Sequence, residues 1–277
     1  MKRIIALMLA LLMVGAVMAA CGTTTSNTTE TKAADNKDTK TVDAAKDLAN
    51  VTSKGKLVVG ITDFEPMDYQ KDGQWVGFDA DMAKAFAKSL GVEVEFVEID
   101  WDNKILELDG GTIDCVWNGM TLTDEVTSAM LCSDPYCNNA QVVVVNKDVA
   151  DKYTTADACK DLSFAVESGS AGQEQAEAHS FKFTEVKDQA TALMEVASGT
   201  CNAAIIDSLM AGAMIGEGTG YAQLTYTVSL NSEEYGVGFR KGSDLTAKCN
   251  EFFASAKADG SMAEIAKTYG VQEALIK

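Results

Sequence analysis

Histidine is almost absent from this sequence. The single one, His179, lies in the polar stretch QEQAEAHS, with no serine or cysteine motif around it. The GxSxG pattern of a nucleophile elbow is missing, and no lysine follows the glycines of SGSAG as a phosphate-binding loop requires. No CxxC pair occurs, so a metal site has little support. These absences argue against a nucleophilic enzyme, and we expect neither a metal nor another cofactor.

Basic residues are scarce relative to acidic ones. The chain has 23 Lys and Arg against 41 Asp and Glu, a formal net charge of −18. Such a surface repels nucleic acid and anionic lipid head groups, so we expect no nucleic-acid partner. A charge of this size usually serves solubility, and it identifies no ligand.

Long apolar runs are equally rare, and the exception stands at the start: MKRIIALMLALLMVGAVMAAC. Two cations precede an apolar run from Ile4 to about Met18, and small residues precede Cys21, which is the order of a secretory signal. A membrane-spanning helix is the alternative, because roughly 17 to 25 residues can cross a bilayer. The ending VMAAC resembles the lipobox of bacterial lipoproteins. We therefore predict that residues 1–20 are a signal peptide and that Cys21 is lipidated.

The segment after Cys21 contains almost no large apolar residue. Residues 22–46 are rich in Thr, Asn, Asp, Lys and Ala, so they cannot bury enough surface to offset the entropy of ordering. We predict a flexible tether over residues 21–50, with the folded part beginning near Val51. Loss of residues 1–20 removes two basic and no acidic residues, which leaves a net charge of −20.

Proline is also rare, with only Pro66 and Pro135, so the organisation must be inferred from hydrophobic patterns. Strand-like runs alternate with helix-like runs up to about residue 145, and the alternation then starts again. Strands are predicted at 57–61, 92–97, 113–116, 141–145, 163–166, 182–186, 202–206, 221–228 and 235–239. Helices are predicted at 79–90, 103–108, 173–179, 189–197, 208–215 and 261–269, with a short one after Thr123 and one capped by Ser243. This alternation predicts the α/β class, with parallel sheets covered by helices.

Polar residues follow several of these strands. In open parallel sheets, ligands bind beyond the carboxyl ends of the strands. The residues there are Asp63 and Phe64, then Asn118, Gly119 and Thr121, then the loop 168–172, and finally Asp207. The glycine-containing loop precedes a helix and could present N–H groups to an anion, although a plain βα turn is the commoner meaning. Asp63 and Asp207 could equally cap a turn and a helix, and Phe64 and Trp101 could be core aromatics.

Seven segments in order resemble the polar amino acid family of ABC-transporter solute-binding proteins, over about Gly55 to Gly270. They are GKLVVGITDFEPMDY, WVGFDADMAKAFAKSLGVEVEFVEIDWD, GTIDCVWNGMTLTDE, CSDPYCNNAQVVVV, DLSFAVESGSAG, ASGTCNAAIIDS and EEYGVGFRKGSDLTAKCNEFFASAKADGSMAEIAKTYG. The resemblance implies a two-lobed periplasmic-binding-protein-like fold of type 2. Each lobe is then a mostly parallel sheet flanked by helices, and two crossover strands, near 144–147 and 228–234, join them. Lobe 1 is expected at 51–145 plus 232–277, and lobe 2 at 146–231.

The resemblance also implies a ligand site in the cleft between the lobes. The family positions that contact ligand are matched here by Asp63, Phe64, Trp101, Asn118, Gly119, Thr121, Glu167, Ser170, Ala171 and Asp207. Among them, Asp207 matches the carboxylate that receives the ligand's α-ammonium group, and Glu167 matches a variable position that contacts the ligand side chain. Ser170 and Ala171 match the turn that binds the α-carboxylate.

One position departs from the family. The family usually reads TxTxER where this chain reads TLTDEV, so Val126 replaces an arginine that pairs with the α-carboxylate. Backbone donors near Thr121 and Ser170 could hold the carboxylate, a basic residue such as Lys104 could reach in, or the ligand could lack a free α-carboxylate.

The function implied is capture of an amino acid or similar small polar solute by an extracytoplasmic lipoprotein. The expected partners are the membrane permease of an ABC importer and the membrane that holds the lipid anchor, and the protein is expected to be a monomer. The alternatives are a dehydratase-type enzyme on the same scaffold, with Asp63, Glu167 and Asp207 as acid–base residues, and a sensor lobe not coupled to transport.

Six cysteines remain besides Cys21: Cys115, Cys132, Cys137, Cys159, Cys201 and Cys249. An export signal makes disulfides possible. Cys132 with Cys137 and Cys159 with Cys201 are geometrically possible pairs, which would leave Cys115 and Cys249 as buried thiols. The alternative is that all six are free thiols buried as small hydrophobes.

Overall fold

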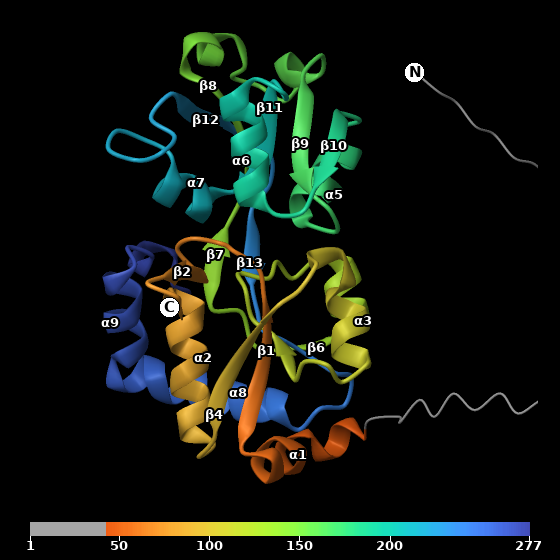
Figure 1. The fold of residues 1–277 in the computed structure, drawn as a ribbon, viewed down its shortest axis with the longest axis vertical. Helices are drawn as coiled ribbons and strands as arrows, with labels where there is room; N and C mark the ends of the chain where they lie inside the picture. The colour runs from red at the N-terminus through yellow and green to blue at the C-terminus, as the bar shows by residue number, and fades with distance from the viewer. Residues whose placement is uncertain (1–42) are drawn as a thin grey trace, which may run out of the picture. The chain divides into compact units, whose positions relative to one another are not determined.

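Residues 43–277 fold into two α/β lobes, each built on a five-stranded sheet (Figure 1). The computed structural model describes these residues. The predicted signal peptide, the lipidation of Cys21 and most of the tether lie outside them. The strand order is β4-β1-β5-β14-β6 in the first sheet and β10-β9-β11-β8-β12 in the second. The α/β class and the two-lobed architecture predicted from the sequence are confirmed.

The first lobe combines residues from both ends of the described chain. Its sheet contains β1 (Lys56–Ile61), β4 (Glu93–Glu98), β5 (Cys115–Val116), β6 (Leu131–Cys132) and β14 (Gly238–Phe239), and its hairpin contains β2 (Tyr69–Lys71) and β3 (Gln74–Val76). Its helices are α1 (Asp47–Lys54), α2 (Phe78–Ser89), α3 (Lys104–Asp109), α4 (Asp124–Ala129), α8 (Leu245–Asp259) and α9 (Ser261–Thr268). Strand β1 lies at the centre of the parallel pairing, between β4 and β5, and is almost entirely buried. Its β-branched run KLVVGI suits that position because both faces are covered.

The second lobe is formed by one continuous stretch. Its sheet contains β8 (Gln141–Asn146), β9 (Ser163–Glu167), β10 (Lys182–Val186), β11 (Ala203–Asp207) and β12 (Leu224–Ser229), and its helices are α5 (Ala171–Ala178), α6 (Gln189–Ser198) and α7 (Ser208–Met214). Strand β9 pairs in parallel with β10 and β11, whereas β8 pairs antiparallel with β11 and β12. Short 3-10 turns complete the chain at Ala44–Lys46, Trp101–Asn103, Lys147–Lys152, Asp157–Cys159 and Gln272–Ala274.

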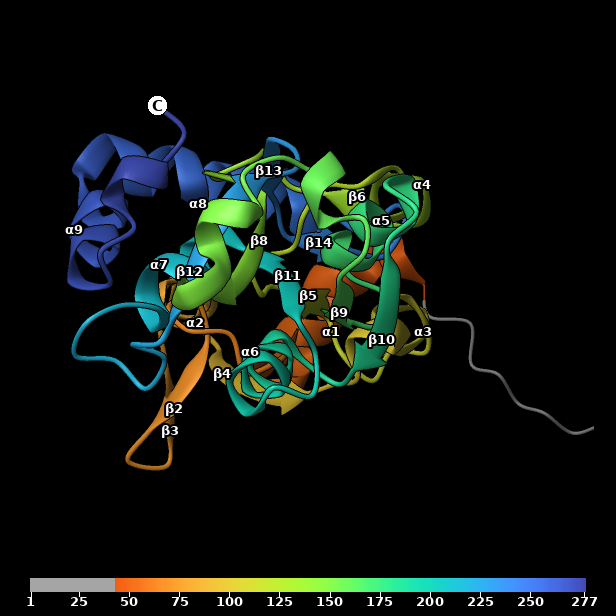
Figure 2. The same cartoon turned by 90° about the horizontal axis from the view of Figure 1, so that it is seen from above.

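Two short antiparallel strands connect the lobes, β7 (Cys137–Asn139) and β13 (Glu233–Tyr235), and Figure 1 shows them between the two sheets. Strand β8 follows β7 directly and belongs to the second sheet. The first crossing therefore lies a few residues before the range 144–147 indicated by the sequence. In the view from above, the β2–β3 hairpin projects to one side of the molecule (Figure 2).

The folded part begins earlier than the sequence indicated. Residues 47–50, assigned above to the tether, form the start of α1. Asp47 is fully buried and forms an ion pair with Arg240 at 2.9 Å, and the Leu48 amide donates to Asp244 at 2.8 Å. These contacts fasten α1 to the first lobe although its sequence is weakly apolar.

The two proposed disulfides are not formed. All six cysteines of the described residues carry free thiols, and five of them are buried. Cys159 packs in the core of the second sheet, whereas Cys201 belongs to a different hydrophobic cluster. The alternative of free, buried thiols is therefore the correct one, with the partly exposed Cys132 as its exception.

Candidate functional site

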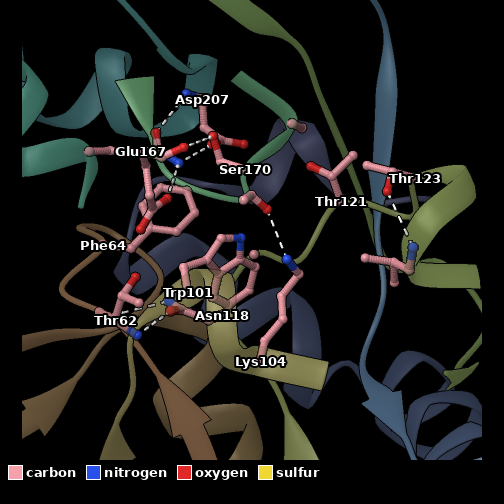
Figure 3. A pocket seen from close by; sticks show the side chains of 15 residues that line it. Thr62, Phe64, Trp101, Lys104, Asn118, Thr121, Thr123, Glu167, Ser170 and Asp207 are labelled. Carbon is pink, nitrogen blue, oxygen red and sulfur yellow. Dashed lines mark hydrogen bonds between the residues drawn. The ribbon is translucent and has the colours of Figure 1, made fainter. Parts of the chain in front are cut away.

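A cavity lies between the two lobes and collects most of the predicted site residues. The space between its lining atoms is about 400 Å³, part of it open to solvent, and the lining residues are Thr62, Phe64, Trp101, Lys104, Asn118, Gly119, Thr121, Thr123, Val126, Glu167, Gly169, Ser170, Ala171, Gln189 and Asp207. Every residue implied by the resemblance is in this lining except Asp63. Figure 3 shows Glu167, Ser170 and Asp207 approaching from the second lobe, opposite Trp101, Lys104 and Asn118 from the first.

Asp63 lies outside the cavity lining. Its side chain is exposed just after β1, and partial burial together with the nearby charges of Asp188 and Glu98 raises its pKa. The structure therefore places Asp63 beside the cavity, while Phe64, the next residue, faces into it.

Phe64 and Gly119 fit together at one wall. Gly119 has φ +54°, and a Cβ added there would lie 2.4 Å from Cε1 of Phe64. Phe64 in turn packs edge-on against Tyr235, with ring centroids 6.4 Å apart. A glycine is thus required at position 119, both for the left-handed backbone and for the close approach of the aromatic ring.

Lys104 supplies the cation of the cavity. It is the first residue of α3, is only 3% exposed, and lies over the Trp101 ring at 5.3 Å. Its ammonium group crosses the cleft and donates to the Gly169 carbonyl at 2.8 Å, which uses one of its three N–H donors. Burial lowers the pKa of Lys104, and the surrounding carboxylates oppose that shift. Among the three ways of compensating for Val126, the structure thus makes a cation available from α3.

A pair of buried carboxyls supports the Asn118–Gly119 loop from behind. Asp79 accepts hydrogen bonds from the Gly119 amide and from the Tyr136 hydroxyl, both at 2.6 Å. Asp68 accepts from the Asn118 side-chain amide at 3.0 Å. Both carboxyls are fully buried, and burial, together with their mutual repulsion at Asp68, raises their pKa values. This cluster fixes the position of the loop that lines the cavity.

In the second lobe, Ser170 caps helix α5. Its hydroxyl accepts from the Gln173 amide at 3.2 Å and donates to the Glu167 carbonyl at 2.7 Å. Ala171 and Gly172 are the first residues of this helix, so their N–H groups have no acceptor inside it. The helix start therefore presents donors and a positive dipole end toward the cavity, as anion binding requires.

Asp207, at the end of β11, is held by three donors. Asn139 and Tyr235 donate to Oδ1, the latter at 2.6 Å, and the Gln189 side-chain amide donates to Oδ2. Its side chain makes no capping hydrogen bond to α7, so the helix-cap interpretation is wrong. Burial and the nearby charge of Glu233 raise its pKa to about 7.

Glu167 is the least satisfied polar group of the cavity. It is 3% exposed, and its Oε1 has no hydrogen-bond partner among the described residues. Its Oε2 receives only a long hydrogen bond of 3.5 Å from Gln189. Burial, followed by the charges of Asp207 and Asp188, raises its pKa to about 8. The cavity therefore offers an unpaired carboxyl beside a second carboxyl.

Six lining residues were not among the predicted site residues: Thr62, Lys104, Thr123, Val126, Gly169 and Gln189. Gln189 begins α6 just after β10, so the rule that ligands meet the ends of parallel strands would have found it. Its side-chain amide donates hydrogen bonds to both Glu167 and Asp207, and its side-chain oxygen accepts one from the Asp207 backbone amide at 2.8 Å. No sequence signal shows that position 104 faces the cleft.

Over 43–277, no helix is long and apolar enough to cross a bilayer. Within the same range, no group of three or more His, Cys, Asp or Glu side chains is arranged to hold a metal ion.

A model for the bacterial extracellular solute-binding proteins, family 3, matches residues 57–272. The arginine-binding extracellular protein ArtP of Bacillus subtilis is 29% identical, over 79% of this chain and 87% of that protein. The ABC transporter glutamine-binding protein GlnH of Bacillus subtilis is 30% identical, over 97% of each chain. The crystal structure of a mutant of ArgBP from T. maritima superposes with a TM-score of 0.76 at 30% identity, over 80% of this chain and 98% of that one.

Proposed function

Since this chain belongs to the bacterial extracellular solute-binding proteins of family 3, we propose that its cavity captures a free amino acid for delivery to the permease of an ABC importer. It is a binding protein and not an enzyme. The similar proteins named above bind arginine and glutamine, which share the α-ammonium and α-carboxylate groups but differ in side-chain charge. Recognition of the shared groups is therefore the first requirement.

The observation that carries the proposal is the pair of opposite charges across the cavity, Asp207 from one lobe and Lys104 from the other. An α-ammonium group loses its water in a closed cleft, and Asp207 is a buried carboxyl that can offset the cost. Three donors already orient Asp207, so little side-chain freedom is lost when a ligand binds.

The α-carboxylate is assigned to Lys104 and to the start of α5. Val126 occupies the position where the family usually has arginine, and it is buried in the cavity wall. Lys104 has two N–H donors beyond the one used by Gly169, and Ala171 adds a backbone N–H. A ligand carboxylate bound there would contact both lobes and favour their closed arrangement.

Membrane attachment is part of the same proposal. Diacylglycerol on Cys21 would hold the protein at the outer face of the cytoplasmic membrane, and residues 22–46 would act as the tether. Both lie outside the described residues, and the motif VMAAC supports them.

Titration calorimetry of Asp207→Ala against the standard amino acids tests this function. Truncating one partner of a buried charge pair should weaken binding by roughly 30-fold to several thousand-fold. Because Asp207→Ala also leaves three buried donors unpaired, Asp207→Asn provides a second variant that keeps the size and an acceptor oxygen. We expect Asp157→Ala, at an exposed surface pair, to bind like the unaltered protein. An affinity unchanged in both Asp207 variants, or an unaltered protein that binds no amino acid, would contradict the proposal.

A further inference from the structure

The ionisable groups of the cavity do not balance when all of them are charged. Glu167 and Asp207 are two carboxyls, and Lys104 is the only Lys or Arg in the lining. Among the described residues, Lys104 forms no ion pair with either carboxyl; its ammonium group is bound by the Gly169 carbonyl. An amino acid with an uncharged side chain brings one positive and one negative group, so it leaves this imbalance in place. A basic amino acid brings one further positive charge, and this charge removes the imbalance.

We propose that the ligand is a basic amino acid whose side-chain cation is bound by Glu167. This inference rests on the proposed function, which assigns the α-ammonium to Asp207 and the α-carboxylate to Lys104. Glu167 lines the cavity and its Oε1 has no hydrogen-bond partner among the described residues, whereas Oδ1 of Asp207 already accepts two hydrogen bonds and Oδ2 accepts one. Asp207 therefore keeps room for the α-ammonium group, and Glu167 has the greater free acceptor capacity for guanidinium or ammonium N–H donors.

Two grooves that adjoin the cavity point to the same ligand charge. A groove that shares Thr121, Thr123 and Ala171 with the cavity is lined by Asp124, Glu174, Glu233 and Glu234 and by no Lys or Arg. A second groove, which shares Trp101, is lined by Asp100, Asp102 and Glu185 with a single cation, Lys187. Clefts lined by one sign of charge raise the local concentration of the opposite ion. The surface on both sides of the cavity therefore favours cationic solutes.

Proton release is a consequence of this arrangement. The groups that face Glu167 are Asp207, Asp188, Gln189 and Lys104, and burial among them raises its pKa to about 8. Asp207 faces Glu233, Gln189 and Tyr235, and its pKa is about 7. A cation favours the ionised carboxylate, so binding at pH 7 should expel protons, and affinity should increase from pH 6 to about pH 8.

An uncharged ligand is the competing possibility, because a protonated Glu167 could donate to an amide oxygen. Arginine and citrulline separate the two, since they have similar shapes and differ in side-chain charge. Arginine and agmatine separate side-chain recognition from carboxylate recognition, because agmatine lacks the carboxylate. Titration calorimetry of the purified protein with arginine, lysine, citrulline, glutamine and agmatine is therefore the test.

We expect arginine or lysine to bind at least about 30-fold more tightly than citrulline or glutamine. Glu167→Gln should weaken the binding of the basic ligand by about 10- to 100-fold and change the affinity for the neutral ligands by less than about threefold. Calorimetry in buffers of different ionisation enthalpy should give a smaller proton release for this variant. The control Glu217→Gln removes an exposed charge from the same lobe and should change nothing.

Each other outcome has a separate meaning. Tighter binding of citrulline or glutamine, or arginine affinity unchanged in Glu167→Gln, overturns the basic-ligand inference and leaves amino acid capture standing. Agmatine binding more tightly than arginine, with dependence on Glu167, preserves the role of Glu167 and overturns amino acid capture. Failure of every compound to bind overturns the basic-ligand inference, while amino acid capture is then decided by the titrations against the other standard amino acids.

Discussion

Asp79 acts on the ligand loop from behind, without contacting the cavity. It accepts the Gly119 amide and the Tyr136 hydroxyl, so one buried carboxyl oxygen satisfies two buried donors. A buried donor left without a partner costs about 1 to 3 kcal/mol. At the residue scale, the position of Gly119 therefore depends on a side chain from α2.

We expect Asp79→Ala to lower the free energy of unfolding by about 2 to 4 kcal/mol and to weaken ligand binding, because both donors lose their acceptor. Asp79→Asn keeps an acceptor oxygen, so it should restore most of the stability and most of the affinity. Urea denaturation and titration calorimetry measure the two effects. Equal losses in the two variants would show that the carboxylate charge, and not the two hydrogen bonds, is what matters.

Some site residues could be predicted from the sequence and others could not. Asp207 could be predicted because it ends a strand and matches a family motif, but its three donors come from Asn139, Gln189 and Tyr235, far away in the chain. Lys104 could not be assigned, because a helix of six residues has too little periodicity to show which side faces the cleft.

At the scale of elements, hydrophobic pattern predicted most strands and helices, and tertiary context decided the rest. The predicted strand 235–239 divides into β13 and β14, which pair with different partners. Around Gly236 the chain also packs closely on Leu122, since an added Cβ there would lie 2.7 Å from the Leu122 side chain. Such breaks depend on neighbours that are distant in sequence, so local pattern does not contain them. The disulfide hypotheses failed for the same reason.

The turn between β9 and α5 packs closely against the first lobe. Gly169 has φ +69°, and a Cβ added there would lie 2.8 Å from the Asp102 Cα, which belongs to the first lobe. Lys104 holds the Gly169 carbonyl in the same place. Gly169 therefore permits the closed arrangement of the two lobes.

We expect Gly169→Ala to weaken ligand binding by about 10- to 100-fold, because the new methyl group meets backbone only when the lobes close. Gly199→Ala is the matched control: it has φ +79° and no atom within 4 Å of an added Cβ. Both variants should lose about 1 kcal/mol of stability from the left-handed backbone, and only Gly169→Ala should lose affinity. Calorimetry and small-angle scattering would measure affinity and closure. An equal loss of affinity in the two variants would contradict the closure argument.

At the scale of the whole molecule, negative charge is concentrated both on the surface and inside. The net charge is −18. Six carboxyls are almost completely buried: Asp47 and Asp114 form ion pairs with Lys or Arg, whereas Asp68, Asp79, Glu167 and Asp207 form none among the described residues. Burial raises the pKa of the latter four. Neither the family resemblance nor the composition could predict this, because burial of a carboxyl depends on how the lobes pack around it.

The raised pKa values predict that the unliganded protein loses stability as pH rises from about 5 to about 8. Unfolded carboxyls titrate near pH 4, whereas folded Asp207 titrates near pH 7 and folded Glu167 near pH 8. Between those limits the folded state binds more protons than the unfolded state, so the free energy of unfolding falls with pH and then levels off. Calorimetric melting temperatures should be several degrees higher at pH 5.5 than at pH 8.

Bound ligand and the Glu167→Gln variant should both reduce this dependence of stability on pH, whereas removal of a surface carboxylate should not. A saturating basic amino acid should flatten it, because the bound cation offsets the ionisation of Glu167 and Asp207. Glu167→Gln should also flatten it, because a glutamine of nearly the same size has no proton to lose, whereas the exposed Glu217→Gln should leave it unchanged. If general repulsion among surface carboxylates were the cause, these two variants would have equal effects. A melting temperature that rises from pH 5.5 to pH 8 without ligand would show that the buried carboxyls are not held in their protonated form.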